Sequence, residues 1–100
     1  MNRQAYRYEF TDQTSLADVK DSLFLAIFAA EGVHGRAQVR LDVGFCLDEK
    51  ARACVVDAGT AVGKTVAQIF TGLLTRQVGE GAFTVEHVFG EPIAGAGASP

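Results

Sequence analysis

The chain reads AQVRLDVGFCLDEKARACVVDA between Ala37 and Ala58, with a strand and then a helix predicted before it and a helix and then a strand after it. From Ala37 to Leu47, apolar side chains alternate with polar or small ones, which is typical of a strand with one face on a core. The segment Asp48–Ala51 is short and polar, as a hairpin loop should be. The centre of Arg52–Ala58 is apolar on both faces, which favours a central strand. We therefore predict a β-hairpin with arms at Ala37–Leu47 and Arg52–Ala58.

The predicted register of this hairpin pairs Phe45 with Cys54 and Asp42 with Asp57. Two carboxylates directly opposite each other repel, so we expect a bulge, a solvated pair or a neighbouring cation at that point. A carboxylate site is the alternative interpretation. In the same register Cys46 and Cys54 point to opposite faces of the sheet, so they cannot form a disulfide with each other.

A strand and a helix are predicted before the hairpin. Aromatic and charged residues alternate over Tyr6–Phe10, which indicates a strand with an aromatic core face. Apolar residues recur on one stripe from Leu16 to Glu31, which predicts a helix. The second half of this helix is apolar nearly all round, and at ~100° per residue Leu25 and Phe28 point well away from the stripe. One sheet cannot cover both sides of a helix, so we expect something else to cover these two side chains.

A second helix and a last strand are predicted after the hairpin. The helix runs from Gly59 to about Val78, and its outer face is nearly uncharged. The strand covers Phe83–Phe89, with His87 among the apolar residues of its core face. Small residues dominate from Glu91 onward, and we predict a disordered tail over 91–100.

The element order is therefore β-α-β-β-α-β. With right-handed crossovers this order predicts an α+β ferredoxin-like sandwich, in which a four-stranded antiparallel sheet carries both helices on one face. We expect residues 1–90 to form a single domain, which suits a chain of 100 residues. This topology supports many functions, so the fold alone identifies none.

Composition excludes some classes of function. The chain is 48% hydrophobic and 21% charged, as expected of a globular protein. Its net charge is −3 and it has no basic run, which disfavours a nucleic-acid partner. We find no apolar window long enough for a signal peptide or a membrane span. The two cysteines have no close spacing, so we expect them to stay reduced, which suits a cytoplasmic protein.

RNA binding by such a sheet would require aromatic side chains on its open face, where bases can stack. The predicted open face instead presents Arg7, Glu9, Ala53 and Val55. An aromatic platform is therefore not predicted, and this function is disfavoured.

The segment Ala58–Thr65 resembles a relaxed phosphate-binding loop, because a small residue is followed by four others and then by Gly-Lys-Thr. The first glycine of that motif is replaced by Ala58. Val62 and Val66 are both needed on the buried stripe, so the helix should begin before Gly63. We therefore expect an ordinary capped helix with Lys64 in solvent.

Metal, cofactor and catalytic sites are not predicted. His34 and His87 have no ligands at metal spacing, and Cys46 and Cys54 lack Cys-x-x-Cys neighbours. The spacing of the chain's nucleophiles and bases builds no catalytic triad. We accordingly favour a non-catalytic role.

The remaining feature is a surplus of apolar surface. Leu25 and Phe28 protrude from the helix layer, while Val55 and Val88 lie on the open sheet face. Exposed apolar patches on small domains mark interfaces, although the second helix and the tail could instead wrap the first helix. Our first hypothesis is an interaction module that self-associates or docks on a larger protein through these four residues.

The alternative hypothesis is a dimeric α+β barrel, in which two open sheet faces close over a small-molecule pocket and an enzyme becomes conceivable. The candidate pocket residues are Arg7, Asp42, Asp57 and Glu86. Mutation of Phe28 should break a helix-mediated dimer, and mutation of Val55 a sheet-mediated one.

Overall fold

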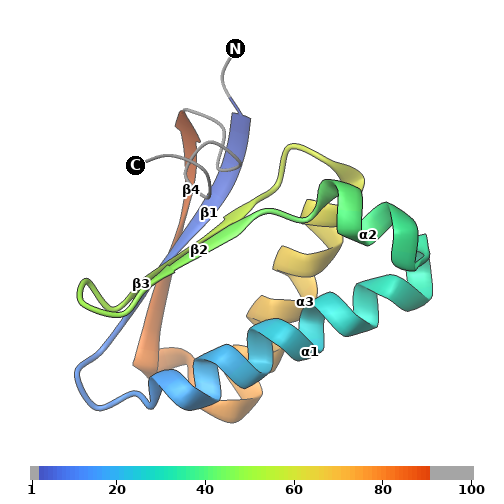
Figure 1. Ribbon diagram of the computed structural model, residues 1–100. Coiled ribbons are helices and arrows are strands. Elements are labelled where there is room, and N and C mark those ends of the chain that lie inside the picture. The colour runs from blue at the N-terminus through green and yellow to red at the C-terminus, as the bar shows by residue number, and fades with distance from the viewer. Residues whose placement is uncertain (1–2, 91–100) are drawn as a thin grey trace.

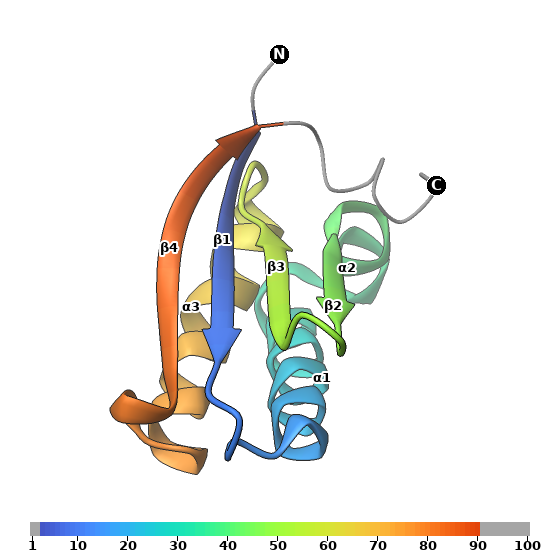
Figure 2. The ribbon, with the colours of Figure 1, turned by 90° about the vertical axis from the view of Figure 1, so that its left-hand side faces the viewer.

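The computed structural model describes residues 3–90, so the predicted tail at 91–100 lies outside the described residues. The elements are β1 (Arg3–Phe10), α1 (Leu16–His34), α2 (Arg36–Asp42), β2 (Phe45–Asp48), β3 (Ala53–Asp57), α3 (Ala61–Gln77), the 3₁₀ helix η1 (Glu80–Ala82) and β4 (Phe83–Gly90). The four strands form one antiparallel sheet in the order β2-β3-β1-β4. The three α-helices lie on one side of this sheet (Figures 1 and 2). The protein is thus an α+β structure, as predicted.

The first arm of the hairpin is much shorter than predicted, because Arg36–Asp42 forms helix α2. Gly35 adopts a φ of 88°, which ends α1 and lets a new helix start at once. Gln38 Nε2 donates to Asp42 Oδ2 at 2.6 Å, a contact between residues four apart that a helix permits. Asp42 therefore lies in a helix, and the predicted pairing of Asp42 with Asp57 is wrong.

The strands of the hairpin pair in a different register from the one predicted. Phe45 lies opposite Val56 and Leu47 opposite Cys54, so the loop falls one residue later in the chain. Asp48 Oδ1 accepts a hydrogen bond from the Ala51 N–H at 3.1 Å, which closes the loop. The shift preserves the face of every side chain. Cys46 is exposed and Cys54 is buried, so the two thiols are separated as predicted.

The core lies between the sheet and helices α1 and α3. Ser15 caps α1 by accepting from the Asp18 N–H at 3.3 Å, and Thr60 caps α3 by accepting from the Gly63 N–H at 3.0 Å. Both helices turn their predicted apolar stripes to the sheet. The largest fully buried side chains are those of Tyr8, Val19, Leu23, Val39, Cys54, Val56, Val62, Val66, Phe70 and Leu74.

The helices in the described part of the chain are not suited to crossing a membrane. Within residues 3–90, every helix is too short or too polar to cross a bilayer.

Candidate functional site

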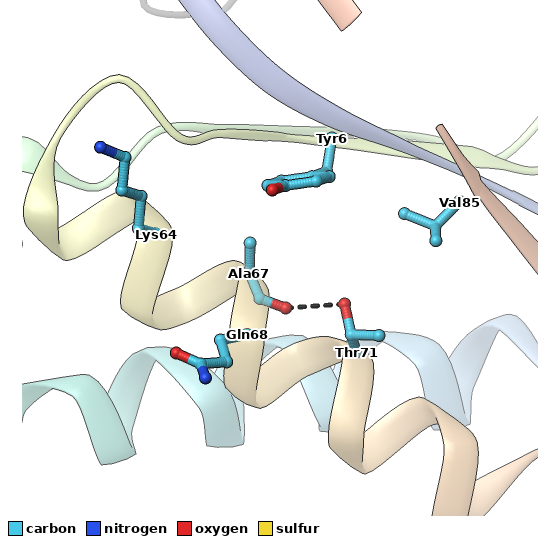
Figure 3. A pocket seen from close by; sticks show the side chains of 6 residues that line it. All are labelled: Tyr6, Lys64, Ala67, Gln68, Thr71 and Val85. Atoms are coloured by element: carbon cyan, nitrogen blue, oxygen red, sulfur yellow. Dashed lines mark hydrogen bonds between the residues drawn. The ribbon is translucent and has the colours of Figure 1, made fainter. Parts of the chain in front are cut away.

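A groove of about 440 Å³ separates α3 from the β4 side of the sheet (Figure 3). Its lining consists of Tyr6, Lys64, Ala67, Gln68, Thr71 and Val85. The four residues from α3 are spaced three or four apart, so they form one face of that helix. The volume falls within the ~300–1,000 Å³ typical of small-molecule sites.

The groove exists because β4 is an edge strand that the helices leave partly uncovered. Val85 is 44% exposed and Phe89 is 62% exposed. Their predicted burial on a core face together with His87 is wrong, since His87 is exposed as well. The alternation that places these side chains on one face was read correctly, but α3 does not extend far enough to cover that face.

Thr71 lines the groove, and its hydroxyl group already has hydrogen-bond partners. The Tyr8 hydroxyl and Thr71 Oγ1 share a hydrogen bond of 2.8 Å, and Thr71 Oγ1 donates to the Ala67 carbonyl at 2.8 Å. Burial raises the pKa of Tyr8 to about 12, so this hydroxyl is neutral at physiological pH. The Thr71 hydroxyl is therefore engaged with a neutral group of the core.

A row of aromatic rings lies beside the groove, beginning at Tyr6. The rings of Tyr6 and His87 are stacked with their centroids 4.7 Å apart, and the His87 and Phe89 rings are 4.8 Å apart. His87 Nε2 lies 3.3 Å from Gln4 Oε1, which helps to orient the imidazole. These rings form a continuous row at the sheet edge.

Three polar groups of the groove have no hydrogen-bond partner among the described residues: the Tyr6 hydroxyl, the Lys64 ammonium and the Gln68 amide. Figure 3 shows the Tyr6 ring between β1 and α3, with its hydroxyl directed toward the Lys64 end of the groove. Lys64 is exposed and is the only charged residue of the lining.

The segment resembling a phosphate-binding loop is an ordinary capped helix, as expected. Helix α3 begins at Ala61, and the Lys64 N–H donates to the Thr60 carbonyl at 3.0 Å. Gly63 lies against the backbone of Asp57, where it serves close helix packing. The N–H groups of Gly63 and Lys64 are therefore both bonded to Thr60 and are not available to a phosphate.

The pocket residues predicted for a barrel are only partly brought together. Arg7 and Glu86 are direct neighbours across β1 and β4, and Arg7 Nε donates to Glu9 Oε2 at 3.0 Å. These three side chains line a shallow hollow of about 370 Å³. Asp57 is buried at the end of β3 and accepts from the Gly59 N–H at 2.7 Å, and Asp42 lies in α2.

The outer face of α1 is apolar, and we call Phe24, Leu25 and Phe28 the α1 surface. These side chains are 56%, 53% and 70% exposed, so the predicted protrusion of Leu25 and Phe28 is confirmed. Phe24 was not predicted, although its spacing of four from Phe28 was a usable signal. Its ring contacts Phe45 edge-on, with the ring centroids 6.2 Å apart.

Histidine and cysteine side chains do not assemble a metal site in residues 3–90, where no cluster of three or more His, Cys, Asp or Glu is present. His34 Nε2 instead lies 2.7 Å from Thr65 Oγ1 and joins α1 to α3. Burial raises the pKa of the Cys54 thiol to about 12, so that thiol is unreactive.

Neither a protein-family model nor a curated protein matches the chain.

Proposed function

We propose that this protein is a non-catalytic module that self-associates through the α1 surface. The observation that carries the proposal is the exposure of Phe24, Leu25 and Phe28 on adjacent turns of one helix. Burial of a Phe or Leu side chain stabilises an interface by ~1.5–3 kcal/mol. All three side chains are more than half exposed, so they form a contiguous apolar patch, and the largest such patch on a small protein is often functional.

A second copy of the chain is the partner that this surface suits best. Ala29 and Gly32 are exposed on the same side of α1, and such small residues let another helix approach closely. Asp18 and Asp21 are exposed on the same face, and both precede the three apolar side chains, so the charge of this surface lies toward the N-terminal end of α1. Packing of α1 against α1 about a two-fold axis would bury the same surface on both protomers.

The test is the molar mass of the protein in solution, measured by sedimentation equilibrium. We expect a dimer for the parent protein and a monomer for Phe28→Asp, because the new carboxylate would be buried without a partner. Val55→Asp, on the sheet, is the matched control and should remain dimeric. Circular dichroism should show that both variants keep the parent's fold.

A parent protein that is still monomeric at a concentration near 100 µM would overturn the proposal. A dissociation constant of that size corresponds to a binding free energy of roughly 5 kcal/mol. If Val55→Asp dissociates the dimer and Phe28→Asp does not, the open sheet faces form the interface. That outcome would favour the dimeric barrel, in which Val55 and Val88 pack together and Arg7 and Glu86 face an enclosed space.

We further propose that the fold is the ferredoxin-like sandwich. The strand order β2-β3-β1-β4 and the position of α1 and α3 on one side of the sheet support this assignment. The additional helix α2 and the short strand β2 are departures from the predicted pattern. A cytoplasmic location is also proposed, on the ground that Cys46 and Cys54 are both free thiols.

A further inference from the structure

We propose that the groove between α3 and β4 binds a small aromatic carboxylate. The groove lies on a different surface from the proposed dimer interface, so the two proposals stand or fall separately. Its volume of about 440 Å³ accommodates one or two fused rings with a short substituent.

The charge of the ligand follows from the end of the groove at which Lys64 lies. Lys64 is the only charged group of the lining, and it has no ion pair in residues 3–90. It lies in the first turn of α3, where the helix dipole also favours a negative charge. The chain as a whole carries a net charge of −3, so this local positive charge runs against the general balance.

The form of the anion follows from the donors beside Lys64. The Tyr6 hydroxyl and the Gln68 amide line the same groove and have no hydrogen bond within the described residues. A carboxylate has two oxygens and about four acceptor positions, so it can accept from the Lys64 ammonium and from the Tyr6 hydroxyl, which Figure 3 shows directed toward the Lys64 end of the groove. A neutral amide in the same place would present a donor to these donors and lose that complementarity.

The flat apolar body of the ligand follows from the rest of the lining. The Tyr6 ring forms one wall, and Ala67 and Val85 line the space beyond it (Figure 3). The hydroxyl of Thr71, which also lines the groove, is already bonded to the buried Tyr8 hydroxyl. His87 and Phe89 continue the aromatic row and provide further stacking surface.

The test uses indole-3-carboxylate as the probe and indole-3-carboxamide as its uncharged counterpart. Binding is followed by the amide ¹H–¹⁵N NMR spectrum of the full-length protein. We expect saturable shifts at Tyr6, Lys64 and Val85 with the carboxylate, and binding weaker by roughly tenfold with the carboxamide.

Two variants separate the roles of charge and ring. Lys64→Met should lower the affinity for the carboxylate by roughly tenfold and leave the affinity for the carboxamide unchanged, since only the charge-assisted contact is lost. Lys50→Met, in the hairpin loop, is the matched control and should bind like the parent. Tyr6→Leu should lower the affinity for both probes, because the ring that forms one wall of the groove is lost.

Equal binding of the two probes by the parent, or an unchanged carboxylate affinity in Lys64→Met, would overturn the proposal. Shifts confined to α1 around Phe28 would overturn it as well, because the probe would then be binding to the α1 surface. An absence of any shift at millimolar probe would have the same meaning.

Discussion

Gly63 lies where helix α3 crosses the end of β3, and a side chain there would meet the sheet. A Cβ at this position would collide with the carbonyl oxygen of Asp57. The backbone of Asp57 cannot move away easily, because its N–H donates to the Gly44 carbonyl at 2.8 Å. Close packing therefore explains a glycine that the sequence alone presented as part of a phosphate-binding motif.

We predict that Gly63→Ala lowers the free energy of unfolding by about 2 kcal/mol or more, because the helix must shift off the sheet. Gly72→Ala is the control, since it lies in the same helix with nothing within 4 Å of its Cβ position. That variant should be stabilised by up to ~1 kcal/mol through helix propensity. Urea denaturation of both variants measures the difference, and equal effects would contradict the packing argument.

The two cysteines differ in exposure, and this difference predicts their reactivity. Cys46 is exposed, whereas Cys54 is buried and its pKa is raised to about 12 by that burial. The thiolate is the reactive form, so Cys54 stays protonated and unreactive at neutral pH. We expect a thiol reagent at pH 8 to modify Cys46 rapidly and Cys54 only after unfolding.

The thiol assay has a direct control in Cys46→Ser, which should show no fast-reacting thiol. Mass spectrometry after a short exposure to iodoacetamide locates the label. Labelling of Cys54 at the same rate as Cys46 would mean that β3 is more accessible than its burial indicates.

Helix α2 is the element for which the sequence pattern gave the wrong prediction, since a strand was expected there. Val39, Leu41 and Val43 alternate with polar residues, which predicted a strand, yet Val39 and Val43 are also four apart, as a helix requires. The structure buries Val39 and leaves Leu41 exposed, so the helical spacing prevails. Nothing in the local pattern distinguished the two readings, and tertiary contact with the core decided between them.

The other elements were predictable because their patterns had one interpretation each. Helix α1 was predicted at Leu16–Glu31 and is found at Leu16–His34, and its apolar outer face was recognised. The groove was not predicted, because it depends on how far β4 extends beyond α3. Its one signal was the nearly uncharged face of the second helix that carries Gln68 and Thr71. That face was predicted to point outward, whereas Thr71 faces the sheet and bonds to the Tyr8 hydroxyl.

Gly35 joins α1 to α2, and this junction gives a prediction at the scale of the element. Its φ of 88° and ψ of 149° are accessible almost only to glycine. We expect Gly35→Ala to lower the free energy of unfolding by ~1–3 kcal/mol, measured by urea denaturation. Gly81→Ala, in open space and without a positive φ, should stay within ~0.5 kcal/mol of the parent.

The change in unfolding free energy of Gly35→Ala shows whether α2 depends on the backbone conformation of this glycine. If Gly35→Ala is neutral, the chain can pass between α1 and α2 in another conformation. The helix would then not depend on this glycine, and its formation would rest on burial of Val39 alone.

At the scale of the whole molecule, the apolar balance of α1 links folding to association. Its inner face fills the core through Val19 and Leu23, while Phe24, Leu25 and Phe28 on the other side remain in water. A fold that used this helix only for its own core would not need three large apolar side chains on the outside. The exposed part of these side chains adds little to the stability of an isolated protomer and becomes favourable only when a second surface covers it.

This coupling predicts that the melting temperature rises with protein concentration. Association with the folded state alone stabilises it by mass action, so a hundredfold increase above the dissociation constant adds ~2.7 kcal/mol. For a domain of 100 residues that free energy corresponds to an increase in melting temperature of roughly 10 °C or more.

Scanning fluorimetry from 1 to 100 µM should show the rise in the parent and in Val55→Asp. Phe28→Asp should melt at one temperature throughout, because its protomers no longer associate. A parent whose melting temperature is independent of concentration, with a monomer mass at every concentration, would mean that the α1 surface meets no second copy of this chain.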